Sequence, residues 1–341
     1  MEIIQPQVPQ ETENYLNFKG TGASLFEIYL VNILLGMVTL GLYYPWGRAR
    51  LLKYIYGETS FYGNRLAFHG TGREMFVGFI KALIIIIVFY GFLIYNLLSY
   101  QDELENSSGD MELIANAFLT FMIYLYGLLG LFFLTIVPLA IHGALKYRLA
   151  KTSWRGIRLG YRGIRSSLFG IYIRDFLLSV ITLGIYTSWF KVNLRKYILS
   201  NIRFGNVTFS YEGAGSDLFV INLKGIILSF LTLGIYSFWY LKDLYNFYVD
   251  NIRVHQNGQT FKVSSSATVG GIFELLVLNW FIVTFTFGLG TPWALSRSLK
   301  FYMGNALVEG GFNPDLVTQT EEEYNDALAE DLTDMFDLAI I

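Results

Sequence analysis

Six long apolar segments divide the chain and alternate with short polar stretches that carry most of its charge. They cover residues 25–46, 75–98, 113–140, 168–189, 218–239 and 270–293. A helix needs about 20 mostly apolar residues to cross the roughly 30 Å hydrocarbon core of a bilayer, and each segment is at least that long. The pattern predicts an all-α integral membrane protein with about six transmembrane helices, and the alternative is a set of buried helices in a soluble core.

Composition supports lipid as the surroundings of these segments. The 341-residue chain is 53% hydrophobic and only 15% charged, whereas a typical soluble protein has about 25% charged residues. It has no cysteine, which excludes disulfides and thiolate chemistry. Its first 17 residues lack the basic and apolar regions of a cleaved signal, so residues 25–46 are expected to act as an uncleaved insertion signal.

An internal repeat is visible when the chain is aligned on Trp46, Trp189, Trp239 and Trp293. Twenty residues before each Trp stands a Phe, seven before stands a Thr and five before stands a Gly. The motif Thr-Leu-Gly-[Leu/Ile]-Tyr occurs in three of the copies, at Thr39, Thr182 and Thr232. An aromatic residue stands eight positions after each Trp, and this regularity indicates four related units.

Turn signals between the units predict small β-hairpins in the loops. Gly-Asn or Asn-Gly pairs, which supply the positive φ of tight hairpin turns, occur at residues 63–64, 205–206 and 257–258. The second and third apolar segments form one expanded unit, because residues 68–72 repeat residues 18–22. The predicted organisation is a polar tail (1–17), units 1 to 5 (18–67, 68–160, 161–210, 211–262 and 263–312) and an acidic C-terminal tail (313–341).

Three groups of residues resemble the signature of the YjgN-like family of bacterial inner-membrane proteins. They are residues 18–22 (FKGTG), residues 40–46 (LGLYYPW) followed by Arg48 and Arg50, and residues 59–63 (TSFYG). The resemblance covers most of residues 15–310. It implies a multi-pass protein of the bacterial inner (plasma) membrane, and the family domain carries no established biochemical function.

Flanking charge leaves two topologies open. If six segments cross, placing loops 47–73, 141–167 and 241–269 in the cytoplasm puts 15 basic residues there against 7 outside. Both termini would then lie outside. The loop 190–217 is also basic, however, which favours the alternative that the ordinary units are re-entrant and return near the Thr-Leu-Gly turn. Every basic stretch would then be cytoplasmic.

Polar side chains inside the apolar segments are candidates for a polar lining or gate. Acids of the outer units could face cations of the middle units if the units pack around a pseudo-symmetry axis. The candidates are Glu27, Asn32, Lys81, Arg174, Asp175, Lys224, Glu274 and Asn279. The alternative is that these residues, which lie near the helix starts, reach the interface with their long side chains. The Thr-Leu-Gly motif is similarly open between an ion-binding helix break and close helix packing.

Two charged regions lie outside the apolar segments. The stretch 142–167 contains seven cations and no acid, so it predicts contact with anionic lipid head groups, although positive-inside signalling explains it equally well. These candidates are Lys146, Arg148, Lys151, Arg155, Arg158, Arg162 and Arg165. The tail from residue 309 to 341 contains acids and no Lys or Arg. It is expected either to form an amphipathic helix that docks on a protein partner or to be a disordered solubilising tail.

The chain shows no pattern typical of an enzyme. Its three histidines, His69, His142 and His255, are scattered, so no metal site, no cofactor and no catalytic residue is expected, and a nucleic-acid partner is not expected either. The expected partner is the lipid bilayer. The first functional hypothesis is permeation or transport of a small solute or ion, and the alternative is a membrane scaffold or lipid-organising protein.

Overall fold

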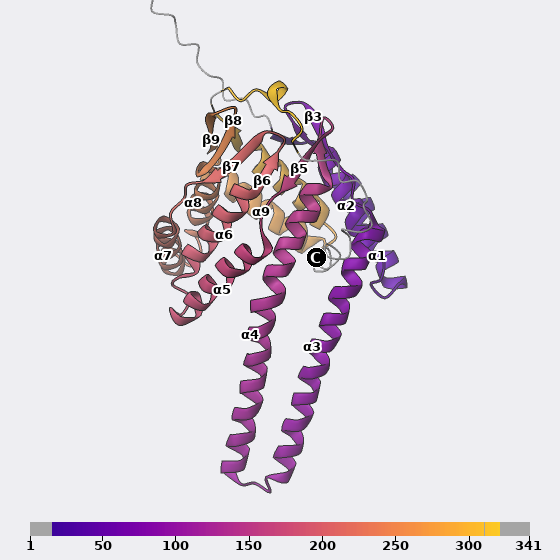
Figure 1. Ribbon diagram of the computed structural model, residues 1–341, viewed down its shortest axis with the longest axis vertical. Coiled ribbons are helices and arrows are strands. Elements are labelled where there is room, and N and C mark those ends of the chain that lie inside the picture. Colours follow the sequence, from indigo (N-terminus) through magenta and orange to yellow (C-terminus); the bar gives the residue numbers. More distant parts are fainter. Residues whose placement is uncertain (1–15, 310, 321–341) are drawn as a thin grey trace, which may run out of the picture.

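The computed structural model describes residues 16–309 and 311–320, and within them the helices form five antiparallel pairs. Four pairs are short: α1 (Gly22–Val38) with α2 (Tyr44–Glu58), α5 (Arg165–Ile181) with α6 (Thr187–Asn201), α7 (Gly215–Leu231) with α8 (Ser237–Asp250), and α9 (Val269–Phe285) with α10 (Thr291–Gly304). The fifth consists of α3 (Gly72–Asn106) and α4 (Met111–Ala150). Figure 1 shows that this long pair reaches far beyond the ends of the short ones.

The prediction of an all-α protein with six transmembrane helices is wrong. Among the described residues, only α3 and α4 are both long and apolar enough to cross a membrane. The other four apolar segments are each broken by a sharp reversal, so a 17-residue first helix such as α1 extends only about 25 Å at 1.5 Å per residue. The hydropathy of these segments is continuous through the turn, which is why it concealed the reversal.

The Thr-Leu-Gly motif produces the reversal by hydrogen bonding and by backbone conformation. In the first unit Thr39 Oγ1 donates to the carbonyl of Leu35 (2.6 Å) and accepts the amide of Tyr43 (3.0 Å). One hydroxyl thus closes the end of α1 and holds the start of α2. Between these bonds Leu40 and Gly41 have φ values of 50° and 87°, and glycine tolerates that left-handed conformation without steric cost.

The long pair follows the same repeat, but a long helical extension stands in place of the short turn. In the repeat alignment Val88 corresponds to Val38, and Pro138 corresponds to Pro45 at the start of α2. Residues 89–136 therefore stand where the first unit has its five-residue turn 39–43. Pro138 lies buried inside α4, at the position where the second helix of a short pair begins.

The loops between helix pairs form one continuous antiparallel sheet rather than separate hairpins, with its strands in chain order. The strands are β1 (Leu16–Phe18), β2 (Thr59–Phe61), β3 (Asn64–Phe68), β4 (Thr152–Trp154), β5 (Ile157–Tyr161), β6 (Ile202–Phe204), β7 (Val207–Tyr211), β8 (Ile252–Gln256), β9 (Gln259–Ser265) and β10 (Ala306–Val308). Strands of neighbouring units pair directly, as in the register Leu66 with Trp154. Turn residues predicted the hairpins, but nothing local specified these pairings between units.

The largest cluster of buried apolar side chains among the described residues lies at the sheet, and residues 311–320 contribute to it. Trp154 is completely buried, and its indole N–H donates to the carbonyl of Phe61 (2.9 Å). Phe312 and Val317 insert into the same cluster. The hydroxyl of Tyr62 donates to the carbonyl of Phe312 (3.2 Å). Of the acidic tail predicted at 313–341, residues 321–341 lie outside the described part of the chain.

Candidate membrane interface

The turns of the four short pairs form apolar tips. At each tip one large apolar side chain is almost fully exposed: Leu40 (94%), Leu183 (94%), Leu233 (95%) and Phe287 (97%). Figure 1 shows the short pairs on the same side of the sheet as the long pair. Clustered apolar exposure of this kind marks a surface that contacts something other than water. The four tips are therefore candidate membrane contacts of the ring to which α3 and α4 belong.

The tip of the first unit lies beside the sheet-proximal part of α3. The ring of Tyr44, at the start of α2, lies 6.0 Å from the ring of Phe79. From Ala82 to Tyr100 α3 contains no charged residue, a length of roughly 28 Å. That stretch is long enough to cover most of a hydrocarbon core by itself, and it continues well beyond the tip of the first short pair.

Three of the predicted lining residues hold the two helices of their own pair together. Asn32 donates from Nδ2 to the carbonyl of Gly47 (3.2 Å), and Asn279 makes the equivalent bond to Ala294 (3.3 Å). Asp175 is fully buried and occupies the same repeat position. Its carboxylate binds Arg174 Nε (2.7 Å) and Asn193 Nδ2 (2.8 Å).

The remaining lining candidates lie on different helices. Glu27 is exposed on α1, and Lys81 is half-buried on α3. Lys224 lies 5.9 Å from the ring centre of Tyr236, within its own unit. Glu274 pairs with Arg297 (3.4 Å). The ion pairs Arg174–Asp175 and Arg297–Glu274 thus lie within single units, whereas the sequence suggested pairs between outer and middle units.

The predicted lipid-contact cations extend from the sheet end of α4 through β4 and β5 to the start of α5. Several make contacts inside the protein. Lys151 Nζ binds Glu74 Oε1 (3.0 Å). Arg155 binds Asp315 (2.7 Å) and lies 5.1 Å from the ring centre of Trp154. The backbone amide of Arg158 donates to Gln319. Lys146 and Arg148 are on α4, and Arg162 and Arg165 lie just before and at the start of α5.

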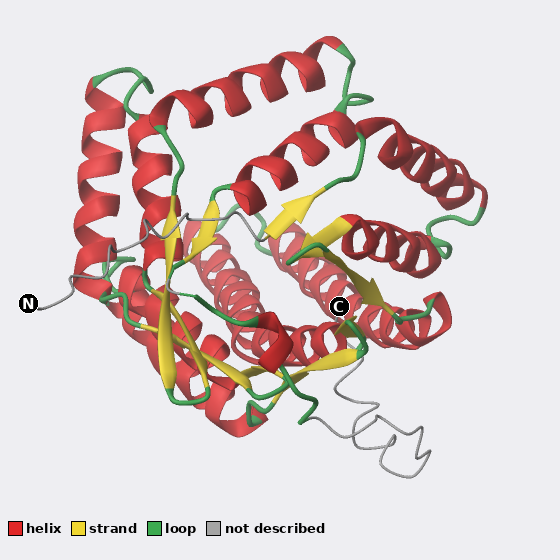
Figure 2. Cartoon of the chain, turned by 90° about the horizontal axis from the view of Figure 1, so that it is seen from above, coloured by secondary structure: helices red, strands yellow, loops and turns green. Residues whose placement is uncertain are grey.

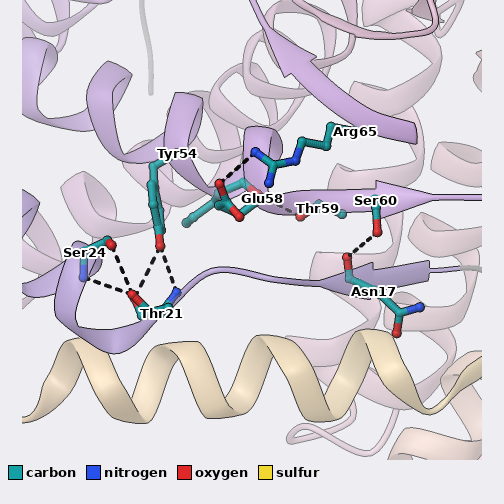
Figure 3. Close-up of polar contacts among 9 residues, drawn as sticks. Asn17, Thr21, Ser24, Tyr54, Glu58, Thr59, Ser60 and Arg65 are labelled. Atoms are coloured by element: carbon teal, nitrogen blue, oxygen red, sulfur yellow. Dashed lines mark hydrogen bonds and ion pairs between the residues drawn. The ribbon is translucent and has the colours of Figure 1, made fainter. Parts of the chain in front are cut away.

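In units 1 and 3 the second helix also holds the start of the first helix. The Tyr54 hydroxyl accepts a hydrogen bond from the backbone amide of Thr21 (2.8 Å). Figure 3 shows this bond together with the hydrogen bond between the side chains of Thr21 and Ser24. Tyr197 accepts the amide of Ile164 in the same way (2.7 Å). These tyrosines are the aromatic residues eight positions after the repeat tryptophans, so that position has a structural role.

A partly buried arginine, Arg195, lies in the middle of α6. The guanidinium carbon of Arg195 is 5.2 Å from the ring centre of Tyr211 and 4.8 Å from that of Tyr248. Burial lowers the pKa of Arg195, while the two tyrosines act in the opposite direction. Burial likewise raises the pKa of Tyr245 to about 12, and its hydroxyl donates to the carbonyl of Tyr302. These contacts fasten the helices of neighbouring units.

The repeat tryptophans form seams between neighbouring units, which sequence reasoning missed. Trp46 lies against Gly72 and, at 5.0 Å between ring centres, against Phe76 of the next unit. Trp293 of the last unit makes the equivalent contact with Gly22 and Phe26 of the first, at 5.2 Å. The helix pairs therefore form a closed ring, and Figure 2 shows them from above, arranged around the strands. The recurrence of Gly, Phe and Trp in the repeat indicated that these residues share a contact. It did not indicate that the contact joins different units.

No metal centre emerges from the part of the chain that the structure describes. Within residues 16–309 and 311–320, no group of three or more His, Asp or Glu side chains is placed to hold an ion. The exposed apolar tips and the two long apolar helices are instead features of the class of integral membrane proteins.

The chain belongs to a bacterial protein family of unknown function, DUF898. The family profile matches residues 13–206, 159–220 and 241–335. The chain is 26% identical to the Inner membrane protein YjgN of Salmonella typhimurium strain LT2, over 182 residues that are 50% of this chain and 40% of that protein. Proteins of the same name from Escherichia coli O157:H7 and strain K12 are each 28% identical over 174 residues.

These comparisons confirm the family resemblance and place the protein in the bacterial inner membrane, in contact with the lipid bilayer. The aligned part spans only 37–40% of the length of these relatives, and 51% of this chain for the two Escherichia coli proteins. No solved structure matches the chain.

Proposed function

We propose that the protein is a one-sided membrane platform, in which two helices cross the bilayer and four short helix pairs insert into the near leaflet from the sheet side. The apolar tips carry this proposal, because Leu40, Leu183, Leu233 and Phe287 are each at least 94% exposed. Eight short helices with a diameter of about 10 Å would add roughly 600 Å² of cross-section to one leaflet. Such an asymmetric insertion would order or displace the lipids of that leaflet.

Charge supports a cytoplasmic position for the sheet. The turn between α3 and α4 and the adjoining helix ends contain Asp102, Glu103, Glu105, Asp110 and Glu112 without a Lys or Arg. The Lys and Arg residues of the long pair all lie in the part nearest the sheet, at Arg73, Lys81, Lys146 and Arg148. Positive charge is retained in the cytoplasm, so the acidic turn would be periplasmic, and the described ends of the chain would be cytoplasmic together with the sheet.

A platform fits the geometry better than permeation. A path across the bilayer must be lined along its whole length, and the described residues provide two helices long enough for that. The polar side chains of the short pairs bind within their own units, as Asn32 does with Gly47. A non-enzymatic role is part of the proposal. The basic stretch 146–165 and the acidic tail would serve as contacts for anionic lipid and for a protein partner.

The proposal is tested by labelling single cysteines from each side of the membrane, since the chain has no natural cysteine. Ser108, in the turn between α3 and α4, should label only from the periplasm. Asn206 and Asn257, in turns of the sheet, should both label only from the cytoplasm. A fluorophore on Leu233→Cys should be quenched by nitroxide lipid, but not by a soluble quencher added from either side.

The result for Asn206 is decisive. If a cysteine there is labelled from the periplasm while one at Asn257 is labelled from the cytoplasm, the segment between them, which contains α7 and α8, crosses the bilayer and the one-sided platform is rejected. Quenching at Leu233 by a soluble agent would show a tip in water and would reject leaflet insertion.

A further inference from the structure

The seam that closes the ring contains a groove of about 520 Å³ between α10 and the start of α1. Arg297 and Lys300 line it from α10, and Gly22 lines it from the first residue of α1. The seam is held at Trp293 and by Ser296, whose hydroxyl donates to the carbonyl of Gly20 (3.0 Å). Two cations thus face the end of a helix that presents free amides and partial positive charge.

The equivalent seam between α2 and α3 contains an acid that the closing seam lacks. Two residues after Gly72 stands Glu74, whose carboxylate accepts the amide of Thr71 (3.0 Å) and binds Lys151. The seam between α6 and α7 has Asp217 at the same position. In α1 this position is Ser24, and the first turn of α1 contains no acidic residue. The repeat therefore provides its own anion at two of its five seams, whereas the first turns of α1, α5 and α9 contain no acidic residue.

The cations of the closing seam are only weakly neutralised by the described residues. Glu274 Oε1 lies 3.4 Å from Arg297 Nη2, and the Glu274 side chain is 68% exposed. Among the described residues, Nε of Arg297 is buried without a hydrogen-bond partner. An anion held in the groove would meet Arg297, Lys300 and the first amides of α1 together.

The two ends of the groove differ in polarity: one end is basic and the other is apolar, which matches the head group and acyl chain of a lipid. Lys300 lies toward the end of α10 that leads into the sheet, whereas Trp293 lies near the apolar tip. Ile282, one turn before the tip on α9, lines the tip side. A head group would thus be at the basic end and hydrocarbon at the apolar end.

We propose that this groove binds the phosphate of an anionic phospholipid, with Arg297 and Lys300 beside the phosphate and an acyl chain directed past Trp293 toward Ile282. The proposal rests on the one-sided platform, because that arrangement places the seam in the near leaflet. At the α10–α1 seam the lipid phosphate would supply the negative charge at the helix start that Glu74 supplies at the α2–α3 seam.

The test measures binding of acyl-labelled phosphatidylglycerol to the purified full chain in detergent, with phosphatidylcholine as competitor. The double variant R297Q/K300Q should weaken binding roughly tenfold or more, because each cation near a membrane phosphate contributes about a factor of five. The control R50Q/K53Q removes the cations at the same repeat positions of unit 1 and should leave binding within about twofold. Ser24→Glu recreates the Thr71–Glu74 arrangement, so it should preserve the fold and abolish binding.

Unchanged binding in R297Q/K300Q, or equal loss in R50Q/K53Q, would overturn the site in favour of general surface charge. Displacement of the labelled lipid by millimolar inorganic phosphate as completely as by unlabelled phosphatidylglycerol would assign the groove to a soluble anion. Cysteine labelling of R297Q/K300Q in membranes separates the two proposals. A wild-type labelling pattern together with lost lipid selectivity confirms the groove on an intact platform, whereas periplasmic labelling at Asn206 rejects the platform itself.

Discussion

The long helix pair and the short pairs are built from the same repeat, yet among the described residues only the long pair is long and apolar enough to cross a membrane. Both α1 and α3 begin at a Gly after a capping threonine, Thr21 or Thr71. Both helices belong to pairs that are joined by strands of the same sheet. They differ in the segment after Val38 and its equivalent Val88, which is a five-residue turn in the first unit and residues 89–136 in the long pair. Span length here is decided by the turn and not by the hydrophobicity of the helix.

The largest expected effect comes from converting the long pair into a short one. Replacing residues 89–136 with Thr-Leu-Gly-Leu-Tyr joins Val88 to Val137 in the register of the first unit. The sheet and ring contacts should remain, because they lie outside the removed segment. We expect the shortened protein to be extracted from membranes by alkaline carbonate, while the full chain stays in the pellet.

The matched control replaces residues 107–110 with a flexible linker of the same length and keeps both spanning helices. This control should behave as the full chain does in the extraction. If the shortened protein resists carbonate as well as the control does, the short pairs alone anchor the protein, and the distinction between long and short pairs has no consequence for membrane integration.

The same comparison shows what the sequence could and could not reveal. Membrane class, the repeat and the turns of the β-hairpins could be predicted, because each depends on local composition or on a dipeptide such as Asn257-Gly258. The reversal at Thr39 was proposed only as an alternative, since its apolar turn residues continue the hydropathy of α1. The ring seam from Trp293 to Gly22 was missed because no local signal relates the last unit to the first.

A smaller effect is expected from a charge at one apolar tip. Leu233 is 95% exposed and makes few contacts, so Leu233→Asp should leave stability in detergent within about 0.5 kcal/mol, as at other surface sites. In a bilayer the same aspartate would cost up to about 3 kcal/mol at the centre and less toward the interface. We expect a lower melting temperature in nanodiscs than for the wild type and no such shift in detergent.

The control for the tip charge is Gln259→Asp, on an exposed position of β9. It should be neutral in both environments because the proposed platform leaves the sheet in water. An equal shift for both variants in nanodiscs would mean that the tips are not in lipid. A shift for Leu233→Asp in detergent as large as in nanodiscs would point to a packing role for that leucine.

The smallest expected effect concerns the backbone of the reversing turn. Gly184 has a φ of 91°, and a side chain is strained there, so Gly184→Ala should lower the free energy of unfolding by about 1–2 kcal/mol. The space around Gly184 is nearly open, with the nearest side-chain atom 4.0 Å from an added Cβ, so the loss would come from conformation and not from collision.

Gly170→Ala is the matched control, because Gly170 lies within α5 and has no heavy atom within 4 Å of an added Cβ. There alanine should stabilise the helix by about 0.5–1 kcal/mol, and denaturant unfolding of both variants in detergent measures the difference. Equal effects at the two positions would show that the left-handed conformation of Gly184 does not matter for stability. The turn motif would then not explain why this helix pair is short.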